Sequence, residues 1–192
     1  GRGAGAIILA GVAGSQLFNA LTSFIVTKAA TADEARGIMF WLLGNLSGVR
    51  WDDVYLALPV AFGGLVVCLW YARALDAFTF GVESAASLGV PVRRVYVVLI
   101  AVAASMTAVM VSLVGSIGFV GLVIPHAARF FVGTRHGLLL PVSALIGAIF
   151  LVAADIVSRI ILDGQVLPIG VITALIGAPA FALILCHGRV LR

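Results

Sequence analysis

The chain alternates between long apolar stretches and short polar breaks. Six apolar runs follow one another, at residues 7–26, 54–71, 95–114, 118–132, 138–154 and 166–186. Most of them reach the ~17–25 residues that a helix needs to cross a hydrocarbon layer about 30 Å thick. The pattern therefore predicts an all-α, polytopic membrane helix bundle with about six transmembrane crossings, formed by residues 1–192 as a single domain.

The fourth run is shorter than the others and is interrupted by glycines and by Pro125. Irregular backbone at membrane depth is tolerated only where protein or a water-filled cavity covers it. We expect Gly118 and Gly121 to mark the point where the third crossing turns into the short fourth one. His126, also in this run, has two interpretations: a proton relay, or a neutral side chain that bonds to another helix or to a loop carbonyl.

Polar side chains recur about one helical turn apart in the first run, among them Gln16 and Asn19. In lipid such side chains form hydrogen bonds between helices, and they also line the walls of transport pathways. Both interpretations stay open for these two residues.

Composition supports the membrane interpretation, because 62% of the residues are hydrophobic and only 10% are charged, with a mean hydropathy of +1.21. Soluble domains carry about a quarter charged residues. Eight of the 12 basic residues lie on the same side as the loop at residues 81–91. They are Arg2, Arg73, Arg93, Arg94, Arg129, Arg135, Arg189 and Arg192. The positive-inside rule therefore places this loop in the cytoplasm, and the net charge of +4 reflects topology and not nucleic-acid binding.

Residues 81–91 are a short polar stretch within this apolar pattern. Glu83 and Ser84 suit the first turn of a short helix, where the hydroxyl caps free amides and the acid faces the positive helix end. Gly89 suits a left-handed closing residue, and Pro91 prevents continuation. A helix this short is not stable alone, and the flanking spans or a docked partner must therefore hold it. Its small side chains and Leu88 have the shape of a plug for another protein; an ordinary loop helix is the alternative.

The spacing of Glu83, Ala85 and Gly89 resembles the cytoplasmic coupling motif of ABC-importer permeases. Residues 118–126, followed by Arg129, resemble the signature of the FecCD-like permeases, which import iron–siderophores, haem and cobalamin. Three later blocks match that family in order: Leu140-Pro141, Ala154-Asp155 with Arg159, and Leu167-Pro168-Ile169-Gly170 through Gly177-Ala178-Pro179.

The resemblance implies a permease subunit that works as a homodimer or beside a homologous permease. The implied ATPase-coupling residues are Glu83, Ser84, Ala85, Ala86, Ser87, Leu88 and Gly89. The translocation path and gate are expected at Ala4, Gly5, Gln16, Asn19, Gly118, Gly121, Pro125 and His126. Family members have ten spans and this chain resembles the last six, so we expect an N-terminally incomplete chain.

Asp155 and Arg159 are four residues apart on one helical face, with the acid first, so their side chains can pair. Anchoring at the membrane interface is the simplest role for this pair. The resemblance adds another, because the family arginine at the position of Arg159 faces the extracytoplasmic substrate-binding protein.

The sequence contains no phosphate-binding loop, and its one lysine, Lys28, has no glycine cradle, so the chain cannot hold ATP itself. No nucleophile, base and orienting residue occur together, and no Cys/His spacing matches a metal site. We therefore expect a permease subunit that is not an enzyme, holds no cofactor or metal, lies in the bacterial cytoplasmic membrane and uses a separate ATPase. The alternatives are a proton-coupled secondary transporter that uses His126 and Asp155, and a membrane scaffold without transport.

Overall fold

The computed structural model describes residues 2–29, 31–162 and 164–188. Within these ranges the chain forms nine α-helices and no strand, which confirms the all-α fold class. The chain divides into two compact units, Gly1–Leu42 and Leu43–Arg192. The prediction that residues 1–192 form one permease domain stays a prediction.

The first unit consists of α1 (Arg2–Ala29) and α2 (Ala32–Leu42). Helix α2 begins with an acid-rich turn, and Glu34 Oε2 accepts hydrogen bonds from the backbone N–H and the hydroxyl of Thr31, both at 2.8 Å. An acid in this position satisfies donors at the helix start and faces the positive end of the helix dipole.

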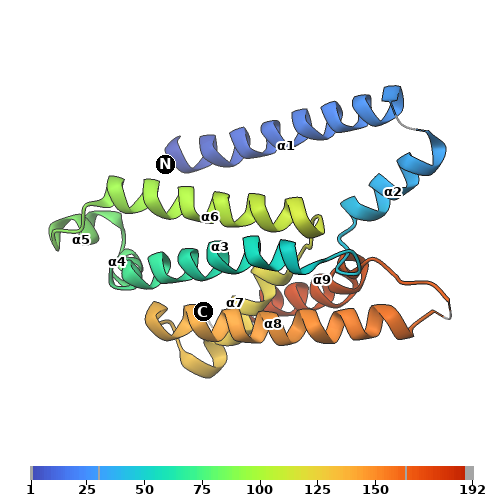
Figure 1. The fold of residues 1–192 in the computed structure, drawn as a ribbon. Coiled ribbons are helices and arrows are strands. Elements are labelled where there is room, and N and C mark those ends of the chain that lie inside the picture. The colour runs from blue at the N-terminus through green and yellow to red at the C-terminus, as the bar shows by residue number, and fades with distance from the viewer. Residues whose placement is uncertain (1, 30, 163, 189–192) are drawn as a thin grey trace. The chain divides into compact units, whose positions relative to one another are not determined.

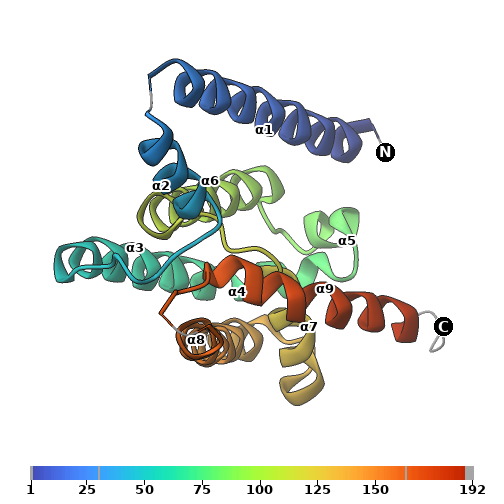
Figure 2. The ribbon, with the colours of Figure 1, turned by 90° about the vertical axis from the view of Figure 1, so that its right-hand side faces the viewer.

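The second unit contains α3 (Trp51–Trp70), α4 (Ala72–Phe78), α5 (Val82–Ser87), α6 (Val92–Val114), α7 (Val120–Val132), α8 (His136–Ile160) and α9 (Ile169–Gly188). Helix α3 contacts α6 and α8, and α8 also packs against α7 and α9 (Figure 1). Figure 2 shows α8 nearly end-on beside α7 and α9. The short helices α4 and α5 lie where α3 ends and α6 begins, and we call this the α5 end of the unit.

In the part of the chain that the structure describes, four helical segments are long and apolar enough to cross a membrane: Leu9–Lys28, Trp51–Trp70, Val92–Val114 and His136–Ile160. Two shorter apolar helices, Val120–Val132 and Ile169–Ile184, fall on the fourth and sixth predicted runs. Large apolar side chains cover the outside of the spans; Phe62, Leu145 and Ile149 are each more than 60% exposed. A soluble protein rarely exposes so continuous an apolar surface, whereas lipid tails solvate it.

The packed core of the second unit lies at the opposite end, which we call the α8–α9 end. Ala154, Ile169 and Ile172 are buried there, and residues of the loops that precede α3, α7 and α9 pack around them. The backbone N–H of Leu167 donates to the carbonyl of Ser158 (3.1 Å), which joins the connection before α9 to the last turn of α8. This end of the unit is therefore closed by side-chain packing and by backbone bonds.

Two glycines allow close approach of neighbouring segments but differ in what stands opposite them. A β-carbon added at Gly170 would overlap the backbone carbonyl oxygen of Leu43, whereas one at Gly64 would overlap the thioether of Met106. A long methionine side chain can change rotamer, but a backbone carbonyl held in a packed junction cannot move without shifting the chain.

We therefore predict that Gly170→Ala lowers the free energy of unfolding by about 1–3 kcal/mol, the usual cost of overpacking. Gly64→Ala is the matched control and should cost less than about 1 kcal/mol, because Met106 can rotate away. Thermal unfolding of the detergent-solubilised protein measures both. Equal losses for the two variants would contradict the rigid contact at Gly170.

Candidate functional site

Helix α5 lies within the predicted coupling segment and has defined ends. It starts after Gly81 (φ 100°), and Glu83 lies in its first turn. Gly89 adopts φ 82°, its N–H donates to the carbonyl of Ala86 (3.0 Å), and the N–H of Val90 donates to that of Ala85 (3.1 Å). These two bonds form a Schellman closure, as the predicted left-handed Gly89 required.

Only one side chain of the predicted coupling set is buried. Ala85 has no exposed surface, because α5 packs on α4 and α6 at this position. The other predicted coupling residues are exposed: Glu83, Ser84, Ala86, Ser87, Leu88 and Gly89. Leu88 is 71% exposed and gives this surface an apolar projection.

The capping role predicted for Ser84 is wrong. The helix begins three residues earlier than that role needs, so the N-cap is Gly81, which has no side chain to bond the first amides. Ser84 lies inside the helix, and its carbonyl accepts a hydrogen bond from the Ser87 hydroxyl (2.8 Å).

Helix α4 packs against α5 and also contacts α6. The N–H of Gly81 donates to the carbonyl of Phe78 (3.1 Å), which closes the short turn between α4 and α5. The ring of Phe78 packs against that of Tyr96 on α6, with centroids 5.3 Å apart. A displacement of α5 therefore acts on α4 through a tight turn.

An acid on α4 forms the second contact of this region, which sequence reasoning missed. Asp76 Oδ1 accepts hydrogen bonds from the backbone N–H (2.8 Å) and from Nδ1 (2.6 Å) of His136, the first residue of α8. The N-cap of α8, Arg135, makes no side-chain capping bond, so an acid from 60 residues earlier performs that role. Asp76 and Glu83 are the two acids on a side rich in arginine, and this was the available signal, since such an acid is expected to have a partner.

Charge and burial act in opposite directions on Asp76. Burial acts to raise its pKa, but the two hydrogen bonds from His136 and the positive charges of His136 and Arg135 outweigh burial, and the pKa is lowered from its ordinary 3.8. Asp76 therefore stays ionised at neutral pH and faces the positive end of the α8 dipole.

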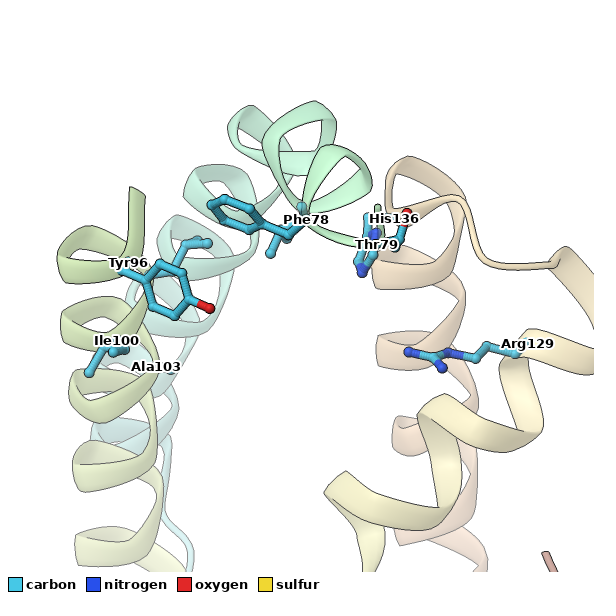
Figure 3. A pocket seen from close by; sticks show the side chains of 9 residues that line it. Phe78, Thr79, Tyr96, Ile100, Ala103, Arg129 and His136 are labelled. Carbon is cyan, nitrogen blue, oxygen red and sulfur yellow. The ribbon is translucent and has the colours of Figure 1, made fainter. Parts of the chain in front are cut away.

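A groove of about 470 Å³ opens between α4, α6, α7 and α8 at the α5 end. Figure 3 shows Phe78 and Tyr96 on one side of it, and Arg129 and His136 on the other. The remaining lining is mainly aliphatic, so the groove combines apolar walls with a basic rim.

The predicted path and gate residues fall on two elements. Gly5, Gln16 and Asn19 lie on α1 and are exposed, and the side chain of Ala4 lies outside the described residues. Gly118, Gly121, Pro125 and His126 all lie on α7 or directly before it. These four residues thus lie together at α7, which corresponds to the short fourth apolar run of the sequence.

His126 contacts its own helix and a neighbour. Its Nδ1 lies 2.7 Å from the carbonyl oxygen of Leu122, and its ring meets the Phe181 ring of α9 edge-on, with centroids 6.2 Å apart. These contacts orient the imidazole between α7 and α9. The interpretation of His126 as a structural residue expected a bond to another helix or to a loop carbonyl. The observed bond is instead to a carbonyl of its own helix, α7.

Asp155 and Arg159 form the ion pair that their spacing predicts. Arg159 Nε donates to Asp155 Oδ2 (2.8 Å), and Nη2 donates to Oδ1 (3.3 Å). About half of the Arg159 side chain is exposed, at the α8–α9 end. The Arg159 guanidinium is thus held in one orientation, and the Asp155 carboxylate partly neutralises its charge.

Among the residues described, no group of three or more His, Cys, Asp or Glu side chains is placed to hold a metal ion. The arrangement instead consists of apolar helices, an exposed short helix at one end and an ion pair at the other. These features define a multi-pass protein of the cell membrane.

The family model of the FecCD transport family matches residues 2–187, and the chain belongs to this family. The cobalamin import system permease protein BtuC of Halobacterium salinarum is 50% identical over 93% of this chain and 47% of its own length. The Fe(3+) dicitrate transport system permease protein FecD of Escherichia coli K12 is 41% identical, covering 95% of this chain and 57% of the relative.

A solved ABC transporter, assigned to the metal-chelate type and in an inward-facing conformation, has the same fold. Its TM-score is 0.87 at 33% identity, and the match covers 94% of this chain and 58% of that one. The chain spans about half the length of the curated relatives it matches.

The bonds of Asp76 predict a pH dependence of stability. Because the pKa of Asp76 is lower in the folded than in the unfolded state, its stabilisation is fully present above 3.8 and is lost as the pH falls through the lowered value. The melting temperature of the wild type should therefore exceed that of Asp76→Asn near pH 5, and the difference should shrink below about pH 4. Asp33→Asn on α2 is the control, and a difference that persisted unchanged to pH 3 would contradict the assignment.

Proposed function

We propose that this chain is part of the permease of an ABC importer that moves an iron–siderophore or a related metal chelate, such as haem or cobalamin, into the cell. In this proposal the chain is not an enzyme, and a separate ABC ATPase supplies the energy. The permease acts as a homodimer or beside a homologous permease. Family membership supports the substrate class, and so do the names of the relatives, which mention cobalamin and ferric dicitrate.

The observation that carries the proposal is the exposed helix α5. Its backbone is closed at Gly89, and its buried Ala85 fixes it on α4 and α6, while Leu88 and Ala86 face outward. A helix of six residues does not fold alone, so this shape is maintained by the spans. A rigid, low-profile helix with one apolar projection suits insertion into a groove of an ATPase subunit.

In the proposed topology, six helices cross the membrane: α1, α3, α6, α7, α8 and α9. Helix α7 has only 13 residues, and it packs against α8 and α9, so protein covers part of its surface. By the positive-inside rule, the α5 end is proposed to lie in the cytoplasm and the α8–α9 end outside. Asp163, which is expected on the outer side, is not among the described residues.

At the outer end, Arg159 is proposed to meet the extracytoplasmic substrate-binding protein, with Asp155 as its positioning partner. The bidentate contact fixes the guanidinium on the last turns of α8 while leaving about half of the arginine side chain exposed. A fixed cation at an interface rim attracts an acidic partner and affects mainly the association rate.

The translocation path is proposed to run beside α7, at Gly118, Gly121, Pro125 and His126. A path role for Gln16 and Asn19 of α1 stays a prediction from the sequence. A cavity of about 410 Å³ lined by Gly121 and Pro125 lies between α7 and α8 and supports this assignment. The secondary-transporter alternative would use His126 as a relay, but the contacts of its ring are to Leu122 and Phe181 and not to an acid.

The coupling role of α5 is tested with Ala86→Trp in the whole protein that carries this chain, co-expressed with its ABC ATPase. Because Ala86 is exposed and α5 is held by other residues, the variant should insert normally but lose ATPase capture and chelate uptake by about tenfold or more. The measurements are ATPase pull-down and uptake of labelled cobalamin and ferric citrate.

Two further variants of α5 sharpen this test. Ala86→Ser is the matched control and should behave as wild type. Ala85→Trp should instead reduce the yield of folded protein, because that position is fully buried. Normal pull-down and uptake in Ala86→Trp would refute the coupling role and favour a secondary transporter or a scaffold.

A second prediction concerns docking at Arg159. Arg159→Glu should slow the association of the loaded binding protein about tenfold at low salt, with a smaller effect at high salt, because screening weakens rim charges. Arg159→Lys keeps the charge and should associate nearly as wild type. Stopped-flow binding to the purified transporter gives the rates, and equal rates for all three proteins at low salt would exclude the docking role.

A further inference from the structure

The start of α8 is held by a residue of a different element. Asp76 binds not only the side chain of His136 but also its backbone N–H, so the bond acts on the helix axis itself. About a third of the Asp76 side chain and less than a fifth of that of His136 are exposed, so the contact is partly shielded from competing water. A charge-assisted pair of bonds to one residue restricts both translation and rotation of the helix start.

The same helix that carries Asp76 also supports α5. Only Thr79, Phe80 and Gly81 separate α4 from α5, and the Gly81 N–H donates to the carbonyl of Phe78. Phe78 in turn packs against Tyr96. Helix α4 is therefore in direct contact with α5, α6 and α8, at one end of the second unit.

Helix α8 extends from this contact to the opposite end of the unit. Its 25 residues correspond to about 37 Å at 1.5 Å per residue, and its last two turns carry Asp155 and Arg159. Side-chain packing against α7 and α9 keeps it aligned. A movement imposed on its first residue is transmitted to the far end with little loss, because a packed helix is stiff along its axis.

We propose that Asp76 and His136 are positioning residues that fasten α8 to the α4–α5 segment, so that a displacement of α5 moves the Asp155–Arg159 end. This inference rests on the proposed function, in which an ATPase moves α5 and a binding protein docks at Arg159. It assigns a residue pair to the coupling between these two sites. Coupling between distant sites requires an element whose position both sites influence, and α8 is that element.

The test compares Asp76→Ala, Asp76→Asn and His136→Ala in the whole transporter, purified with its ATPase. The readout is the ratio of the ATPase rate with substrate-loaded binding protein to the rate without it. Asp76→Ala removes the acceptor of both bonds and should lower this ratio about fivefold or more. Asp76→Asn keeps an acceptor oxygen and should stay within about twofold of the wild type.

His136→Ala keeps the backbone bond and should give an intermediate ratio, with less risk to folding. The double variant Asp76→Ala/His136→Ala should be no worse than Asp76→Ala, because both changes break one link. A role in stability alone would lower the yield and melting temperature but leave the ratio of the assembled complex unchanged, and that result would overturn the proposal.

The outcomes also separate this inference from the proposed function. If the wild-type protein does not capture an ATPase, the proposed function fails and the inference fails with it. If capture and stimulation are normal in both wild type and Asp76→Ala, only the fastening role of Asp76 and His136 is refuted.

Discussion

Two helices of the second unit, α3 and α8, use an acid to satisfy a backbone N–H at their start, and the α8 contact determines how the α5 end is held together. Each helix start leaves such donors unpaired, and lipid offers no acceptor for them. Helix α3 solves this locally, because Asp53 accepts the N–H of Arg50 at 2.8 Å. Helix α8 uses Asp76 of α4 instead. A requirement of backbone chemistry therefore fixes α4 against α8, and with it the base on which α5 rests.

The helical segments were predictable because exposure to lipid leaves a strong, local signal in the sequence. The run at residues 95–114 became α6 (Val92–Val114), and the short run at 118–132 became α7 (Val120–Val132), which has Pro125 inside it as expected. Closure at Gly89 was also predictable, since a glycine followed by Val90 and Pro91 leaves few other backbone conformations. These features depend on neighbouring residues only.

Features that depend on distant residues were not predictable. Ala85 and Ala86 are chemically identical, and only the packing of α5 on α4 and α6 decides that the first is buried and the second exposed. The bond between Asp76 and His136 joins residues 60 positions apart and belongs to no local pattern. The capping role predicted for Ser84 was wrong for a related reason. The first residue of so short a helix depends on the turn that precedes it.

Both ends of the second unit expose apolar side chains, Ile160 of α8 among them at 71%, but the side chains named below differ in their burial. At the α8–α9 end, Ile169 and Ile172 are almost fully buried within the unit itself. At the α5 end, Phe80 is 78% and Leu88 is 71% exposed. Backbone bonds of Gly89 and Val90 close α5, so its fold does not need the Leu88 side chain. Exposed apolar groups at a helix that is already closed gain free energy by contact with another surface, and this is what a docking helix requires.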